Sequence, residues 1–378
     1  NIFLLFINVT TCKFLFIIIE ALFDKKQRKC FLDIDEIRPI KWQTEKLFLL
    51  DQRSIPENNN YVECSSCDDV VNSIKNMIVR GAPAIGVAGA YAMVLSWINS
   101  QGASQNERQK IFLLDAEKVR LARPTAVNLQ WAVNTMVETF KKVKSECVKT
   151  SLEHAAVAMH REDLLGNYKM GDLGSEFLES DSKVMTHCNA GAFATTGYGT
   201  ALGVIKSGWS KKFIKHVFIT ETRPWLQGSR LTATELRSEN ISHSIIVDSA
   251  AASVMKSEKI DWIIIGADRI AKNGDVANKI GSYSLAVLAN FHRAKFMVVA
   301  PTSSIDSNCD NGAAVPIEYR DGKELLRPSV RDKESLNFCV NPVFDITPAA
   351  LIDVLVTENG AIRNPDQRKI AALLKYRC

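Results

Sequence analysis

The stretch DWIIIG at residues 261–266 decides the fold of the larger part of this chain. Three consecutive isoleucines are too apolar for a strand with one face in water, so they indicate a strand that is buried on both faces. Four other segments share this apolar character, and a helix-forming segment follows each of the first four strands. We expect the strands at Lys183–His187, His216–Glu221, His243–Asp248, Asp261–Gly266 and Lys295–Ala300, and the helices at Gly191–Lys206, Leu231–Ser238, Ala250–Lys256 and Val276–His292. This alternation predicts a parallel, Rossmann-like sheet with helices on both faces. No G-x-G-x-x-G follows any of these strands, so a dinucleotide is not implied.

The part of the chain before this sheet has a different pattern. It combines two short strand-like runs with several helical segments, expected at Lys46–Asp51, Asn60–Cys64, Asp68–Val79, Ala84–Asn99, Glu107–Leu121 and Ala126–Val143. The chain is therefore predicted to be an α/β protein with two domains. The smaller, mainly helical N-terminal domain is placed at residues 37–165, and the Rossmann-like C-terminal domain at residues 166–378.

The first residues stand apart from both domains. Residues 1–23 are nearly all apolar, although Lys13 and Glu20 interrupt them, and four basic residues follow within residues 25–29. We interpret residues 1–36 as a leader that is not part of the fold; a membrane anchor is the alternative.

Composition excludes several classes of protein. The chain has 378 residues, a net charge of +5, 46% hydrophobic and 24% charged residues, which is ordinary for a globular protein. A charge this mild fits a binder of a small anion better than a nucleic-acid-binding protein. Nine scattered cysteines indicate reduced thiols, and the Cys64–Cys67 pair lacks the partners of a zinc site. We therefore expect no metal and no cofactor.

Polar residues gather where the predicted strands end, and ligands of open parallel sheets bind at that edge. Cys188 follows the first strand, Asp248 ends the third and Asp268 follows the fourth. Each has a structural alternative: Cys188 could be a small buried hydrophobe, Asp248 could cap the next helix, and Asp268 could pair with Arg269. A Gly/Ala-rich entry into a helix follows Cys188, and free helix amides there would favour a thiolate or a phosphate.

The N-terminal part contributes two arginines, Arg80 and Arg123, each placed just before a helix with a proline near its first turn. Such an arginine beside exposed backbone donors suits a phosphate group. Asn278 and Lys279, in the helix expected after Asp268, could add an amide and a point charge. The alternative is that these arginines are ordinary surface charges, against which their position beside small residues argues. Taken together, the residues suggest a phosphate-bearing ligand between two domains, next to a thiol and a carboxylate.

Several motifs resemble the methylthioribose-1-phosphate isomerase family, in the same order and over nearly the whole chain from about residue 37. They are IVRGAPAIG (78–86), ARPTAVNLQWA (122–132), THCNAGAFATTGYGTALGVI (186–205), ETRPWLQGSRLTATEL (221–236), GADRIAKNGDVANKIGSYSLA (266–286) and FDITPAALI (344–352). The resemblance implies a homodimer that acts in methionine salvage, in the cytoplasm with a nuclear pool as an addition. We expect a sugar phosphate and a second copy of the chain as partners, with no nucleic acid, and with no membrane unless the leader is a membrane anchor. The chain departs from the pattern in the leader and at Ser307–Asn311.

The resemblance also implies roles for individual residues. Cys188 is the catalytic cysteine and Asp268 the catalytic acid. The substrate contacts fall on Arg80, Gly81, Ala82, Arg123, Gln227, Asn278 and Lys279. In the expected mechanism Asp268 protonates the ring oxygen, and Cys188 relays a proton between C2 and C1 or stabilises the species formed there. A direct hydride shift is the competing route.

Two other functions stay open at this point. The alpha, beta and delta subunits of the translation-initiation guanine nucleotide exchange factor share the fold family and are regulatory. A ribose-1,5-bisphosphate isomerase would have nearly the same site. An apolar pocket at the 5-position, for which Trp42 or Trp225 could serve, would favour the methylthio sugar.

Overall fold

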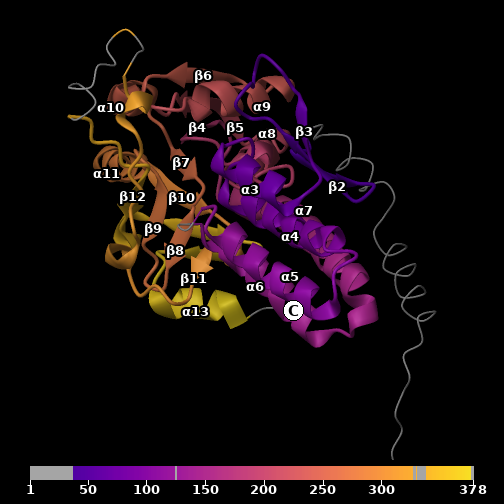
Figure 1. Cartoon of the computed structure of the whole chain (residues 1–378). Coiled ribbons are helices and arrows are strands. Elements are labelled where there is room, and N and C mark those ends of the chain that lie inside the picture. Colours follow the sequence, from indigo (N-terminus) through magenta and orange to yellow (C-terminus); the bar gives the residue numbers. More distant parts are fainter. Residues whose placement is uncertain (1–36, 124–125, 327–328, 330–337, 376–378) are drawn as a thin grey trace, which may run out of the picture. The chain divides into compact units, whose positions relative to one another are not determined.

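A parallel sheet forms the centre of the C-terminal part (Figure 1). The computed structural model describes residues 37–123, 126–326, 329 and 338–375, so the predicted leader lies outside the described residues. Within them the largest sheet has seven strands in the order β14-β13-β10-β7-β4-β5-β6, all parallel except for the β13–β14 pair. The strands are β4 (Ser182–Thr186), β5 (Ile214–Thr220), β6 (His243–Ile246), β7 (Trp262–Ile265), β10 (Lys295–Val299), β13 (Val354–Thr357) and β14 (Gly360–Arg363). The prediction of a Rossmann-like parallel sheet is thus confirmed.

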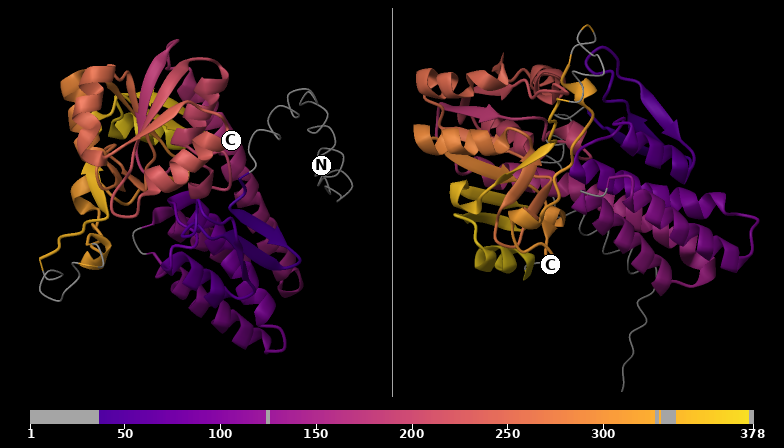
Figure 2. Two further views of the ribbon diagram at one scale, coloured as in Figure 1. Left: turned by 90° about the horizontal axis from the view of Figure 1, so that it is seen from above. Right: turned by 60° about the vertical axis from the view of Figure 1, so that its left-hand side comes forward.

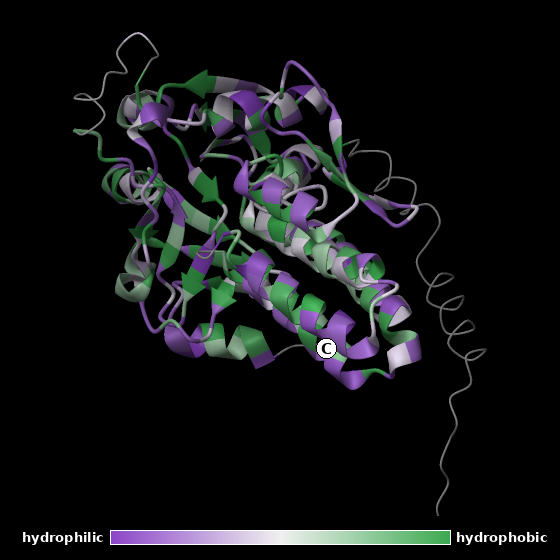
Figure 3. Ribbon diagram, in the orientation of Figure 1, coloured by the Kyte–Doolittle hydropathy of each residue, from purple (hydrophilic) through white to green (hydrophobic). Residues whose placement is uncertain are grey.

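The isoleucine run explains why this sheet is covered on both faces. Successive side chains of a strand point to opposite faces. Ile263 and Ile265 belong to one buried cluster with residues of α10 (Ala251–Glu258) and α11 (Ser282–His292). Trp262 and Ile264 belong to another, with residues of α8 (Ala201–Ser210) and α9 (Ala233–Ser238). Figure 3 shows hydrophobic residues along the central strands.

The N-terminal part combines a small antiparallel sheet with long helices, and in both views of Figure 2 these helices gather on one side of the central sheet. Its elements are β1 (Ile40–Gln43), β2 (Lys46–Leu50), β3 (Tyr61–Cys64), α3 (Cys67–Lys75), α4 (Ala82–Asn99), α5 (Gln105–Arg120), α6 (Val127–Lys142) and α7 (Val148–Ser175). Of the described helices, only α4 has the length and apolar composition of a membrane span, and 89% of its residues are buried inside the protein. It is therefore the core helix of this part, as its small apolar residues predict. The predicted boundary at residues 165 and 166 falls within α7.

Two of the predicted helices begin later than expected, because their first residues are not helical. The segment expected to be helical from Gly191 contains only a short 3-10 turn, η2 (Ala192–Ala194), and α8 begins at Ala201. Tyr198 and Gly199 have φ values of 65° and 96°, which no right-handed helix accommodates.

The second wrong segment is Val276–His292. Its first residues form the strand β9 (Val276–Lys279), Gly281 follows with a φ of 106°, and α11 begins at Ser282. Strand β9 pairs with β8 (Arg269–Ala271) and with β12 (Phe344–Thr347), and β11 (Ile305–Asp306) completes this small sheet of the described residues. Partners distant in sequence therefore override the local helical pattern.

Candidate active site

A cleft with about 680 Å³ of open space lies where α4 begins and the strands β4 and β7 end. All the residues singled out from the sequence as catalytic or substrate-binding line it. They are Arg80, Gly81, Ala82, Arg123, Cys188, Gln227, Asp268, Asn278 and Lys279. Residues separated by up to about two hundred positions are thus brought to one place by the carboxyl edge of the sheet and the first turn of α4.

Cys188 directly follows His187 at the end of β4, and its backbone is held in an unusual conformation. Its φ is 59°, in the left-handed region that a side chain other than glycine rarely adopts. Its N–H donates to the hydroxyl of Thr222 at 2.8 Å, and its carbonyl accepts from the hydroxyl of Thr232 at 2.6 Å. Strain of this kind persists only where neighbouring groups fix the backbone, and it concentrates at functional sites.

The Cys188 thiol is buried, and this burial raises its pKa, against the opposing effect of the Arg80 and Lys279 charges. The expectation that free helix amides surround it is wrong. The helix α8 begins only at Ala201, and the amides of Ala192 and Phe193 already donate to the carboxylate of Glu235. Negative charge on Cys188 is stabilised by the charges of Arg80 and Lys279 and by the backbone amide of Asn189.

Asp268 is half-buried in the wall of the cleft, just after β7. Its N–H donates to the carbonyl of Ala277 at 3.0 Å. Desolvation raises the pKa of its carboxyl, and the charges of Lys279, Arg123 and Arg80 oppose that rise. The neighbouring Arg269 pairs with Asp306 at 3.3 Å. Asp248, for its part, accepts from the amides of Thr222 and Arg223 instead of capping the following helix.

Three cations face the cleft: Arg80 and Lys279 are buried, and Arg123 is half-buried. Arg80 and Arg123 lie before α4 and α6, and Lys279 lies on β9, not in a helix as predicted. Burial lowers the pKa of each. Among the described residues, three buried polar atoms of the lining have no hydrogen-bond partner: Nε of Arg80, Nε of Arg123 and Oε1 of Gln227. Unsatisfied donors beside excess positive charge fit an anionic, hydroxyl-bearing ligand.

The sequence reading missed other lining residues, of which Arg320, Met77 and Phe344 are the most informative. The guanidinium groups of Arg123 and Arg320 both approach the sulfur of Met77, at 3.4 and 3.6 Å. Arg320 also binds Glu318 at 2.8 Å. It lies in an irregular polar segment, PIEYRDG, that no strand or helix pattern connects to the site. No local signal could have identified it.

His187 lines the cleft beside Cys188. Its ring nitrogens contact the hydroxyl of Thr220 at 2.6 Å and the carbonyl of Ile280 at 2.9 Å, and burial lowers its pKa. A neutral imidazole that donates to Ile280 fixes the chain next to Lys279.

The two tryptophans considered for the 5-position differ. Trp42 stacks on Tyr91 with a ring separation of 4.9 Å and donates to Glu153, away from the cleft. Trp225 lines a small recess that shares Arg80 and Gln227 with the cleft. Across the described residues, no group of three His, Cys, Asp or Glu side chains is placed to hold a metal ion.

Comparison with known proteins defines the class first. Residues 78–364 match the initiation factor 2 subunit family. The methylthioribose-1-phosphate isomerase of Alkalilimnicola ehrlichii is 46% identical over 341 residues, which cover 90% of this chain and 98% of that protein. The crystal structure of 5-methylthioribose 1-phosphate isomerase from Pyrococcus horikoshii OT3 has a TM-score of 0.81 at 36% identity, covering 90% of this chain and 97% of that chain. The delta subunit of translation initiation factor eIF-2B from A. fulgidus has a TM-score of 0.77 at 38% identity, covering 90% of this chain and 100% of that chain.

The chain therefore belongs to the initiation factor 2 subunit family, on its methylthioribose-1-phosphate isomerase branch.

Proposed function

We propose that this chain converts 5-methylthio-D-ribose 1-phosphate into 5-methylthio-D-ribulose 1-phosphate, in methionine salvage, with Cys188 and Asp268 as its catalytic pair. The observation that carries the proposal is their convergence on one cleft with three cations, of which Arg80 and Lys279 are buried. A thiol, a carboxyl with a raised pKa and a phosphate site are together what such an isomerisation needs.

The cations bind the phosphate. Arg80, Arg123 and Lys279 supply a net positive charge in a desolvated place, where attraction to a phosphate dianion is stronger than in water. The unpartnered Oε1 of Gln227 accepts from a sugar hydroxyl. This anchoring holds the substrate with its C1 end fixed.

Asp268 opens the ring. Because C1 carries phosphate, the substrate has no free aldehyde, and the bond between C1 and the ring oxygen must break first. A carboxyl whose pKa is raised by desolvation keeps its proton nearer to neutral pH. Asp268 gives this proton to the ring oxygen as that bond breaks, and recovers it from a substrate hydroxyl afterwards.

The hydrogen at C2 then moves to C1. A thiol with a raised pKa is a poor base, so the burial of Cys188 favours direct transfer of the hydrogen, with the thiol shielding the cationic intermediate. Proton relay by Cys188 is the alternative route. A substrate deuterated at C2 distinguishes the two, since direct transfer keeps the label and relay exchanges it with water.

A second recess, next to Asp268, has an apolar side that fits a methylthio group, formed by Ile85, Val315, Pro316 and Phe344. Arg123 and Arg269 also line this recess, and Arg269 pairs with Asp306. In the recess beside Trp225, the guanidinium of Arg230 is already taken by the carbonyls of Gln52, Arg53, Ile55 and Trp225. A 5-phosphate would need a cation there that is available for it.

We also propose that the chain forms a homodimer and acts in the cytoplasm, with a nuclear pool in addition. Tyr283, Val287 and Phe291 recur every four residues on α11 and are exposed, with Phe291 at 79%. Such an apolar stripe fits burial against a second copy. Light scattering of the purified chain should give twice the monomer mass, and Phe291→Asp should reduce it to the monomer mass.

The direct test is turnover by the full chain. We expect ketose formation from methylthioribose 1-phosphate, at least about a hundredfold faster than from ribose 1,5-bisphosphate, and loss of activity in Cys188→Ser and Asp268→Asn. The likeness to the eIF-2B delta subunit favours a second candidate, a non-catalytic subunit. A folded wild-type chain that turns over neither sugar would support that candidate and refute the isomerase.

A further inference from the structure

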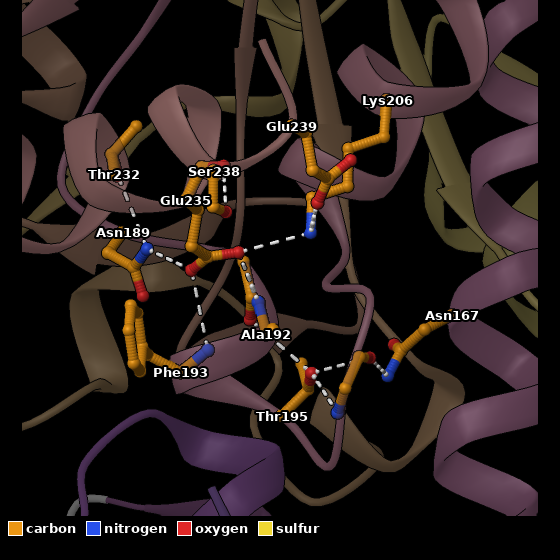
Figure 4. A network of polar contacts seen from close by, with 12 residues as sticks. Asn167, Asn189, Ala192, Phe193, Thr195, Lys206, Thr232, Glu235, Ser238 and Glu239 are labelled. Carbon is orange, nitrogen blue, oxygen red and sulfur yellow. Dashed lines mark hydrogen bonds and ion pairs between the residues drawn. The ribbon is translucent and has the colours of Figure 1, made fainter. Parts of the chain in front are cut away.

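Glu235 is a fully buried carboxylate on α9, outside the reacting groups (Figure 4). One of its oxygens accepts from Nδ2 of Asn189 at 2.8 Å, and the other accepts from the amide of Ala192 at 2.8 Å. The second oxygen also pairs with Nζ of Lys206 at 3.2 Å. A buried charge with this many donors is fixed in place, since moving it would leave several polar groups unsatisfied.

Asn189 connects this carboxylate to the cleft. Its Oδ1 accepts from Nη2 of Arg80 at 2.5 Å, and its main-chain carbonyl accepts from the same guanidinium at 3.4 and 3.5 Å. A side-chain amide has a donor end and an acceptor end, whereas a carboxylate only accepts. Glu235 therefore holds the NH2 end of Asn189 on its own side, which turns the oxygen toward Arg80.

Lys206 balances the buried charge. Its side chain is 1% exposed and pairs with both Glu235 and Glu239, at 3.2 and 2.7 Å. In Figure 4, Glu239 lies farther from Asn189 than Glu235 does. The negative charge of Glu235 also favours the charged form of Arg80, whose pKa burial lowers.

We propose that Glu235 is a positioning residue for phosphate binding, which acts through Asn189 to orient the guanidinium of Arg80 toward the ligand. The inference rests on the proposed function only in taking phosphate as the ligand of Arg80. It assigns to a buried acid of α9 a task in a site that it does not touch.

The variant Glu235→Gln tests this without changing the shape of the side chain. If its oxygen faces Asn189, its NH2 meets the donors of Ala192 and Lys206. If its NH2 faces Asn189, the amide of Asn189 turns over and presents its own NH2 to Arg80. In either arrangement an NH2 group faces another hydrogen-bond donor. In the second arrangement the Arg80 guanidinium also loses the Asn189 oxygen that orients it.

The first measurement is the binding of inorganic phosphate to the full chain by calorimetry. We expect Glu235→Gln to weaken it about tenfold, the size that one misdirected charge-assisted hydrogen bond typically has. Glu239→Gln removes the same charge beside the same lysine and should leave the affinity within about twofold. In the Arg80→Ala background, Glu235→Gln should have no further effect, because its route to the ligand is gone.

The second measurement is the kinetics on methylthioribose 1-phosphate, in which KM should rise about tenfold and kcat should change less. Additive effects of Glu235→Gln and Arg80→Ala, or unchanged phosphate affinity in Glu235→Gln, would overturn the inference. Phosphate binding that depends on Glu235 in a chain without turnover would keep the inference and reject the isomerase.

Should Glu235→Gln fail to fold, Asn189→Ala serves in its place. It removes the connecting amide and leaves the contacts of Glu235 with Ala192 and Lys206 intact. The same tenfold loss in Asn189→Ala supports the inference, and wild-type phosphate affinity in Asn189→Ala refutes it.

Discussion

Replacing Gly81 by alanine tests whether the activity of the cleft depends on the close approach of its two walls. Gly81 precedes α4 with a φ of 87°, and Arg80 is its neighbour. A methyl group at this position would lie 2.5 Å from both Cα and O of Ala194, in the opposite wall. Normal carbon contacts begin near about 3.5 Å, so the walls would have to separate by about 1 Å.

The energetic cost has two parts. A side chain with a positive φ costs about 1 to 2 kcal/mol, and overpacking against fixed backbone adds about 1 to 3 kcal/mol. Arg80 and Asn189 would move apart with the walls, and a displacement of this size typically lowers turnover about a hundredfold. We therefore expect Gly81→Ala to lose about 2 to 5 kcal/mol of stability and about a hundredfold in kcat/KM.

Gly102→Ala is the matched control. Gly102 has a similar φ of 95°, but a methyl group there would meet nothing within 4 Å. It should lose only about 1 to 2 kcal/mol and keep wild-type kinetics. Urea denaturation gives the stability and initial rates give kcat/KM. A folded Gly81→Ala protein with wild-type kcat/KM would refute the reasoning.

Three further changes give distinct expectations. Asp268→Asn should lower kcat about 10² to 10⁴-fold and yet stabilise the fold at pH 8. The pKa of Asp268 is raised in the folded state, so ionisation of its carboxyl destabilises the folded protein as the pH rises from 3.8 through the folded pKa. The asparagine variant avoids this loss. Thermal denaturation should show this gain disappear below pH 4, and an equal gain at both pH values would contradict it. Arg320→Gln should raise KM about tenfold, whereas Lys323→Gln, an exposed cation of the same loop, should not. Thr232→Val removes the hydroxyl that fixes the carbonyl of Cys188, and should reduce kcat about tenfold; unchanged kcat would show that the strained Cys188 backbone needs no such clamp.

The sequence predicts the part of this molecule that local patterns control. Buried runs such as that of β7 locate the central sheet, and their carboxyl ends place Cys188 and Asp268 at one edge. Lys279 shows where this stops. Its segment reads as helix, but pairing with Phe344–Thr347, some 65 residues away, makes it a strand. Lys279 lines the cleft, but the prediction that it lies in a helix is wrong.

Glu235 and Arg320 show a second limit. A glutamate in a short helix and an arginine in a polar loop are ordinary surface residues by type. Whether such a side chain is buried depends on a partner far along the chain, Lys206 for Glu235 and Met77 for Arg320. No period or motif near either residue carries that information.

The loop after β4 determines which groups near Cys188 can attract an anion. The sequence suggests helix amides near Cys188, but Glu235 occupies those of Ala192 and Phe193. Arg80, Arg123 and Lys279 supply formal charges for anion binding; each is desolvated at some cost, and none forms a salt bridge with a carboxylate among the described contacts. The three cations repel one another, so the site destabilises the folded protein until a dianion binds to it. Phosphate should consequently raise the melting temperature of the wild type, and Arg123→Met should raise the melting temperature of the unliganded protein while reducing the shift that phosphate causes. A lower melting temperature for unliganded Arg123→Met would show that Glu318 and Met77 already compensate the charge, and that the cations are not held in opposition before the substrate binds.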